Sequence, residues 1–131
     1  MSAWERHTSL PNPKFQFLDG GHIKLLENFA WGLERVPAGF ICDGSSVPRV
    51  LHSYVRPFGA GLRAALFHDQ DYRAQQVTRA VADARFHHRL KLIGMRKSKA
   101  WVVWAGVRAG GWVTWKKHKA VLAAKRHHAS S

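Results

Sequence analysis

The spacing of apolar residues changes at one stretch, Gly39-Phe40-Ile41-Cys42-Asp43-Gly44-Ser45-Ser46-Val47-Pro48-Arg49. Short apolar runs that alternate with polar residues come before it, and apolar residues at helical spacing come after it. Pro48 suits the first turn of a helix, and Ser46 suits the cap just before that turn. This succession predicts an α+β fold, with a small N-terminal antiparallel sheet followed by a mainly helical C-terminal part.

The residues before this stretch are typical of β-hairpins. Asp19-Gly20-Gly21 joins two alternating runs, 15–18 and 22–26, and this turn chemistry favours antiparallel pairing. Residues 29–36 and 39–42 are expected to add one or two more strands.

The residues after it predict helices with well-marked ends. One helix is expected from about Gly61 to Gln76. The next begins after Thr78, a good cap, and ends at Gly94, a good C-terminal stop. The last helical stretch is expected to be capped by Ser98 and broken or bent at Gly110-Gly111.

A chain of 131 residues fits one domain, and a domain of this size buries roughly two-thirds of its unfolded surface. We therefore expect residues 1–131 to form a single domain. An irregular arm over 1–13 should precede a β-rich part over 14–46. A helical part over 48–128, which opens with a short helix over 49–55, should end in a basic segment.

Charge is divided unevenly along the chain. Residues 1–83 hold nine Lys and Arg against all eight acids, whereas residues 84–131 hold twelve Lys and Arg and no acid. Such basic blocks usually meet an anionic partner, here lipid headgroups, nucleic acid or an acidic protein. The alternative is a solvated surface that keeps the protein soluble.

Several classes of protein are excluded or disfavoured by composition. Cys42 is the only cysteine, which rules out a disulfide-framed scaffold. Residues 1–6 have no apolar run after their charges, so we expect no signal peptide. The most apolar late stretch, 101–115, is too short to span a bilayer and carries Arg108, so we expect no transmembrane segment.

The first segment that could carry chemistry is the loop at residues 43–46. Asp43, backbone carbonyls and serine oxygens can together bind a hard cation. The alternative is structural, with Asp43 and Ser46 satisfying turn and cap hydrogen bonds.

The second segment is Phe67-His68-Asp69-Gln70-Asp71-Tyr72. His68 and Tyr72 are four residues apart and share a helix face, with Asp69 about a quarter turn away. This set offers a general base, a metal ligand and an orienting hydroxyl, and Asp83 on the following helix can return a carboxylate toward His68. In the alternative, His68 and Tyr72 pack under the sheet while Asp69 pairs with a nearby arginine.

Together the two segments resemble a known family. The pattern is Gly-Phe-x-x-Asp-Gly-x-Ser-x-Pro-Arg at 39–49, His-Asp-x-x-Tyr at 68–72, and then Arg79 with Asp83 and Phe86. It is similar to a domain of unknown function found mostly in tailed phages and prophages, over about residues 30–110. The resemblance implies a phage origin and no particular reaction. The matching positions are Asp43, Ser46, Pro48, His68, Asp69, Tyr72 and Asp83.

His-Asp-x-x-Tyr also resembles the helix motif of secreted and viral phospholipases A2. That resemblance implies that His68 activates water, Asp69 holds calcium, and Tyr72 orients a second aspartate, here Asp83. The chain departs from that family because it lacks the cysteines and the glycine-rich calcium loop, for which 43–45 would have to substitute. Zinc hydrolases are a second analogy. In them, His52 or His87 would be extra ligands.

The basic C-terminal part contains four tryptophans, Trp101, Trp104, Trp112 and Trp115, within an arc of about 80° on an unbroken helix. Either all four rings are core, or they form a basic aromatic face against lipid headgroups, nucleic acid or a protein partner. The residues expected on such an anionic-surface site are Arg108, Lys116, Lys117, Lys119, Trp112 and Trp115.

Three functions follow from these features. The first is a metal-assisted hydrolase, using calcium or zinc at Asp43 and Asp69, that acts on lipid or peptidoglycan during phage entry or lysis. His68, Asp69, Tyr72 and Asp83 would be its catalytic residues. The second is a non-enzymatic virion or assembly protein that binds an acidic phage protein or DNA. The third, a nucleic-acid binder, rests on charge alone. Each places the chain in the cytoplasm of the infected host, in the virion, or in both.

Overall fold

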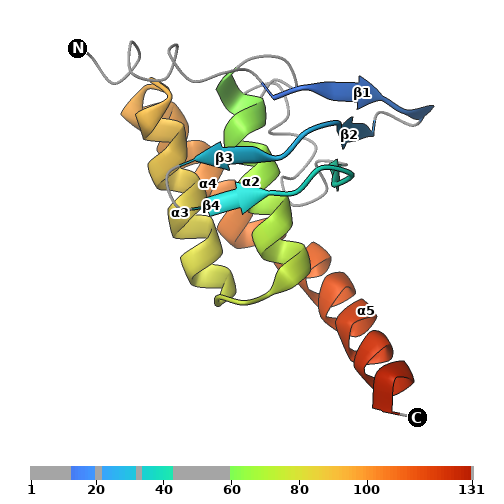
Figure 1. Ribbon diagram of the computed structural model, residues 1–131. Coiled ribbons are helices and arrows are strands. Elements are labelled where there is room, and N and C mark those ends of the chain that lie inside the picture. Colours follow the sequence, from blue (N-terminus) through green and yellow to red (C-terminus); the bar gives the residue numbers. More distant parts are fainter. Residues whose placement is uncertain (1–12, 20–21, 32–33, 43–59, 131) are drawn as a thin grey trace.

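The structure is a computed structural model that describes residues 13–19, 22–31, 34–42 and 60–130 (Figure 1). These residues form five short strands followed by four helices, which confirms the predicted α+β class. The loop at 43–46 and the short helix expected over 49–55 lie outside the described residues, as does all but the last residue of the arm expected over 1–13.

The strands form two small antiparallel sheets. The first contains β1 (Phe15–Phe17), β2 (Ile23–Leu25) and β5 (Ile41–Cys42), in the order β1-β2-β5. The second pairs β3 (Phe29–Trp31) with β4 (Glu34–Val36). In the first sheet β1 lies opposite β2, so the predicted hairpin is confirmed.

One face of the strands is buried against α2 (Ala60–Ala74), as expected from a period of two. Ile23 and Leu25 are buried on β2 while Lys24 between them is exposed. On α2, residues 62–69 are all buried. Phe67 meets the β3 side chains, because its ring centroid lies 6.0 Å from that of Phe29.

Helix α3 (Arg79–Leu92) begins and ends where the sequence predicts. The Thr78 side chain caps it by accepting a hydrogen bond from the Val81 backbone N–H at 3.2 Å. Gly94 follows the helix with φ of 91°, a conformation that glycine adopts without strain. Both predicted ends are confirmed.

The predicted cap of α4 (Lys97–Gly110) is wrong. Arg96 occupies the cap position and makes no side-chain capping bond, while Ser98 lies inside the first turn. The helix begins too early for the Ser98 hydroxyl to cap it.

The last two helices follow each other with a single residue between them. Gly111 separates α4 from α5 (Trp112–Ser130). Helical hydrogen bonds continue through it, from Gly111 N to Val107 O at 2.7 Å and from Trp115 N to Gly111 O at 3.0 Å. The first turns of α5 pack on the body, and the rest of the helix projects away from it (Figure 1).

The helices build a second core, because α3 packs against both α2 and α4. Its fully buried apolar side chains include Ala64, Phe86, Leu90, Val103 and Val107. Polar side chains are buried in the same helical layer, and they form the candidate site.

The cap of α3 provides a test of this architecture. Thr78→Ala removes the acceptor for the Val81 N–H and should lower the free energy of unfolding by about 0.5–2 kcal/mol in denaturant titrations. Thr78→Ser keeps the hydroxyl and should retain most of that stability. Equal losses in the two variants would show that the hydroxyl does not stabilise the helix.

Candidate functional site

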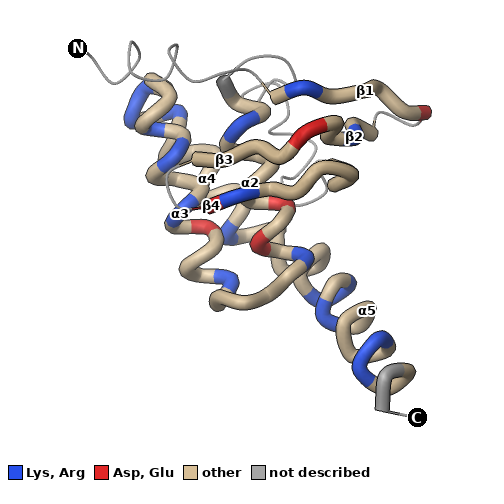
Figure 2. Tube along the Cα trace, in the orientation of Figure 1, with Lys and Arg blue, Asp and Glu red and all other residues tan. Residues whose placement is uncertain are grey.

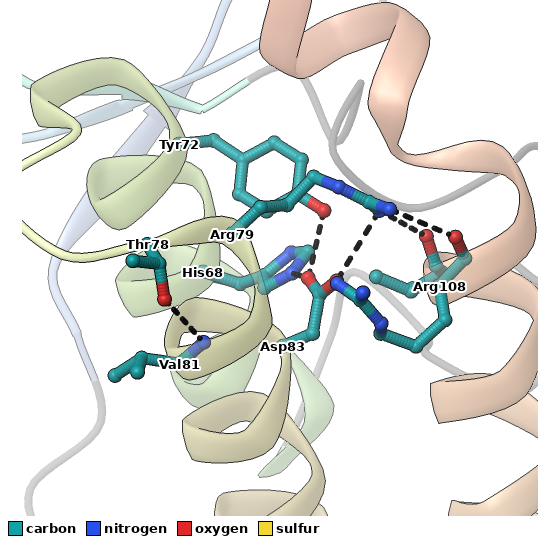
Figure 3. A network of polar contacts seen from close by, with 8 residues as sticks. His68, Tyr72, Thr78, Arg79, Val81, Asp83 and Arg108 are labelled. Atoms are coloured by element: carbon teal, nitrogen blue, oxygen red, sulfur yellow. Dashed lines mark hydrogen bonds and ion pairs between the residues drawn. The ribbon is translucent and has the colours of Figure 1, made fainter.

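The site is centred on the carboxylate of Asp83, which is fully buried on α3 (Figure 3). His68 Nε2 lies 2.8 Å from Asp83 Oδ1, and the Tyr72 hydroxyl donates to the same oxygen at 2.7 Å. His68 and Tyr72 lie one turn apart on α2, so both face α3. The expected return of the Asp83 carboxylate toward His68 is therefore observed, while the catalytic roles of these residues stay predictions.

Two arginines satisfy the second carboxylate oxygen. Arg108 on α4 approaches Asp83 Oδ2 at 2.9 Å, and Arg79 on α3 approaches it at 3.4 Å. Arg79 also donates to the backbone carbonyls of Val107 and Arg108, at 3.2 and 3.1 Å (Figure 3). Asp83 thus links α2, α3 and the end of α4.

These contacts decide the charge of the carboxylate. Burial alone would raise the pKa of Asp83, but the hydrogen bonds from His68, Tyr72 and Arg108 outweigh burial and lower it. Burial, followed by the hydrogen bond to Asp83, raises the pKa of Tyr72. Asp83 is therefore an anion at neutral pH, and Tyr72 is a protonated donor.

Aromatic rings enclose this polar cluster. The His68 ring stacks on Phe86 with centroids 4.4 Å apart, and Tyr72 lies 4.4 Å from His68 on another side. Trp115 of α5 meets Tyr72 edge-on at 5.1 Å. His68, Tyr72 and Asp83 are consequently all 0% exposed.

Gly111 permits the junction of α4 and α5 to pack closely against Tyr72. A Cβ atom at this position would lie 2.4 Å from the Tyr72 hydroxyl oxygen and 2.6 Å from the Val107 carbonyl oxygen. Any side chain would displace one of these groups, so the contact between the α4–α5 junction and the cluster requires glycine.

Asp69 points away from the Asp83 cluster although it is adjacent to His68. Its Oδ2 accepts a hydrogen bond from the Cys42 thiol at 3.0 Å. Successive helix residues differ by about 100° in direction, which sends His68 toward α3 and Asp69 toward β5.

Only some of the residues predicted to bind a metal lie in the described part of the chain. Asp69 and Cys42 could supply two ligands, and no group of three His, Cys, Asp or Glu side chains that could hold an ion occurs among residues 13–19, 22–31, 34–42 and 60–130. Asp43 and His52 lie outside these residues. His87 stacks on Trp104 with centroids 5.5 Å apart.

A second polar cluster was not expected from the sequence. Glu34 of β4 pairs with Arg85 at 3.5 Å and also with Arg89, both on α3. Arg85 also lies 3.8 Å from Asp71 of α2, whose pKa is raised by burial more than the nearby arginines lower it. No local pattern connects residues that are about 50 positions apart, so the sequence held no signal for it.

The residues expected on a basic aromatic face divide into two groups. Arg108 and Trp115 contact Asp83 and Tyr72, and the Arg108 side chain remains 34% exposed. Lys116, Lys117 and Lys119 are exposed. Trp101 is 58% exposed and Trp112 50% exposed, so the interpretation that places all four tryptophans in the core is wrong.

Fold and site define a class, an α+β protein in which a buried aspartate joins three helices through a histidine, a tyrosine and two arginines. A family model matches residues 25–107, and the chain belongs to that family, described as protein of unknown function (DUF1353). The match includes His68, Tyr72, Arg79 and Asp83 and ends before α5. No curated protein and no solved structure matches the chain. Among the described residues, no helix is long and apolar enough to cross a membrane.

The packing at Gly111 yields a prediction. Gly111→Ala should lower the free energy of unfolding by about 1–3 kcal/mol, because the new methyl group overlaps the Tyr72 hydroxyl. The loss should shrink in a Tyr72→Phe background, which a double-mutant cycle measures. Gly110→Ala alters an exposed neighbour and should cause no loss. If both alanine variants behave alike, the close approach to Tyr72 is unimportant.

The ionisation of Asp83 yields a pH prediction. A carboxyl whose pKa is lower in the folded chain stabilises it above the unfolded pKa, about 3.9, and this contribution is lost as pH falls through the folded pKa. Stability of the natural chain should therefore drop as the pH falls below about 4, and that of Asp83→Asn should drop less. At pH 7 the variant should lose about 3–5 kcal/mol, since two arginines lose their counter-charge.

Glu27→Gln is the matched control, because Glu27 forms an exposed pair with Lys14 at 3.2 Å. Its effect at pH 7 should be at most about 1 kcal/mol. If the free energy of unfolding fell equally with pH in Asp83→Asn and in the natural chain, Asp83 would not be the buried anion.

Proposed function

We propose that this protein is a phage or prophage accessory hydrolase that acts on an envelope component, lipid or peptidoglycan, during entry or lysis. The observation that carries the proposal is the contact of His68 Nε2 with an ionised Asp83 that Tyr72 also holds. The phage context is supported by the resemblance of the 39–49 and 68–83 patterns to a phage family. The protein would act in the infected host, in the virion, or in both.

The contact with Asp83 suits His68 to general-base catalysis. Because Asp83 is an anion, it accepts a hydrogen bond from Nε2–H, so the proton of the neutral ring stays on Nε2 and Nδ1 is the basic nitrogen. Nδ1 would take a proton from water while the water oxygen attacks an ester or amide carbonyl. The imidazolium, stabilised by Asp83, would then return that proton to the leaving group.

Tyr72, Arg79 and Arg108 would act as positioning residues. They hold Asp83 through its two oxygens, with the tyrosine on Oδ1 and the arginines on Oδ2. A carboxylate fixed by three groups besides His68 keeps the imidazole in one orientation, which general-base catalysis requires.

The proposal includes a divalent cation, calcium or zinc, held by Asp43 and Asp69. Such an ion would polarise the carbonyl that water attacks. The described residues supply Asp69 for this site, and none of the proton transfers assigned to His68 depends on the ion.

A second candidate is a non-enzymatic virion or assembly protein that binds DNA or an acidic phage protein. The observation that favours it is the complete burial of His68, Tyr72 and Asp83. A buried polar network whose members satisfy one another can serve to specify a single helix packing. The two candidates differ in what a change at His68 does.

His68→Gln separates the candidates. Glutamine can still donate to Asp83 but cannot act as a base, so a hydrolase should lose about 10²–10⁴-fold in rate and stay folded. Fatty-acid release from phosphatidylglycerol vesicles and fragment release from purified peptidoglycan measure the rate, each with calcium or zinc added. Thermal unfolding measures stability.

His88→Gln is the matched control, since His88 is exposed on α3. It should keep the hydrolytic rate of the natural chain. If the natural chain cleaves neither substrate, or if His68→Gln loses stability without any change in rate, the hydrolase proposal fails and the structural candidate stands.

A further inference from the structure

The second half of the chain presents a basic helix, α5, whose cations the Asp83 cluster does not use. Beyond its first turn, α5 carries the exposed cations Lys116, Lys117, Lys119, Lys125 and Arg126. No acid follows Asp83 in the sequence, so α5 brings no negative charge of its own (Figure 2). Contacts with the body occur early in the helix, where Gln75 donates to the Trp115 carbonyl at 2.8 Å.

The five cations surround the helix axis. At about 100° per residue, they lie at about 40°, 140°, 220°, 320° and 340° from Trp112, with no gap wider than about 100°. The exposed valines do not form a separate face, because Val113 and Val121, at about 100° and 180°, lie on either side of Lys117 at about 140°. The projecting part of α5 therefore has no apolar side and no neutral side.

This distribution disfavours a lipid surface. A helix that lies in a membrane interface buries one apolar face and keeps its cations on the opposite one. If α5 lay on lipid, some of its cations would point into the acyl region. Self-association is disfavoured as well, because the chain carries a formal net charge of +13.

A helix with cations on all sides suits a groove with anions on both walls. The major groove of duplex DNA is about 12 Å wide and has phosphates along both edges. An α-helix with its side chains is about 10–12 Å across, and the 19 residues of α5 span about 28 Å, close to one turn of duplex. Proteins that bind single-stranded nucleic acid usually combine basic residues with aromatic rings on which the bases stack. Residues 116–131 contain no Phe, Tyr or Trp.

We propose that α5 is a duplex-DNA-binding arm, with its lysines and arginine contacting phosphates from within the major groove. Lysine contacts to phosphate carry no base information, so the binding is independent of sequence. The inference goes beyond the proposed hydrolase and does not depend on His68, because it rests on the placement of cations on α5 alone.

Salt dependence and a charge-matched pair of variants test it. The full-length chain is titrated with a 20-base-pair duplex while tryptophan fluorescence is followed, since Trp112 is exposed beside Lys116. Five phosphate contacts give a slope of about −4.5 for log K against log salt. The triple variant Lys117→Gln/Lys119→Gln/Lys125→Gln should reduce that slope by about 3 and weaken binding about 500-fold at 0.1 M salt.

The control triple is Arg96→Gln/Lys97→Gln/Lys99→Gln, which removes the same charge from exposed positions before and at the start of α4. It should weaken duplex binding far less than the α5 triple. Equal weakening by both triples would overturn the proposal, because net charge alone would then explain binding. Thermal unfolding confirms that both variants are folded, and glutamine preserves helix propensity.

Three other probes at the same ionic strength distinguish the remaining partners. They are the single strand of the same length, phosphatidylglycerol vesicles and poly-glutamate. Weaker binding to all three supports the duplex assignment. Binding to vesicles, single strand or poly-glutamate as tight as to duplex overturns it, as does the absence of duplex binding at 0.05 M salt.

Discussion

The burial of one carboxylate, that of Asp83, is the constraint on which the rest of this structure depends. An ionised carboxylate is costly to remove from water unless its oxygens are hydrogen-bonded and its charge is matched. Here the side chains that satisfy it come from α2, α3 and α4. The network therefore favours this relative arrangement of the three helices, since a shift of any of them would leave a charge or a donor without its partner.

The same constraint reaches the start of α5. Arg79 binds Asp83 and also the last carbonyls of α4, so it stabilises the end of that helix as well as the buried charge. Gly111 then lets the chain pass against Tyr72, and Trp115 covers the phenol ring. The direction in which α5 leaves the body is consequently set by residues of the Asp83 cluster.

Charge pairing also explains why the basic character of the protein is concentrated where it is. The acids Glu34, Asp71 and Asp83 pair with Arg79, Arg85, Arg89 and Arg108 near the strands and the first helices (Figure 2). Their charges are matched within the fold. The lysines of α5 have no acid on their own helix and lie on the part that projects, so their field extends into solvent.

The sequence by itself determined what depends on near neighbours in the chain. Hairpin pairing of β1 with β2, the Thr78 cap, the stop at Gly94 and the shared face of His68 and Tyr72 all follow from periodicity and backbone preference. Only the tertiary structure decided that Arg108 pairs with Asp83, that Glu34 meets Arg85 and Arg89, and that Ser98 does not cap α4. The Arg108 and Glu34 contacts join residues 25–55 positions apart, and Ser98 lies within the first turn because α4 begins before it. The relative placement of packed elements decides which distant side chains can meet, and spacing along a single helix or strand carries no information about it.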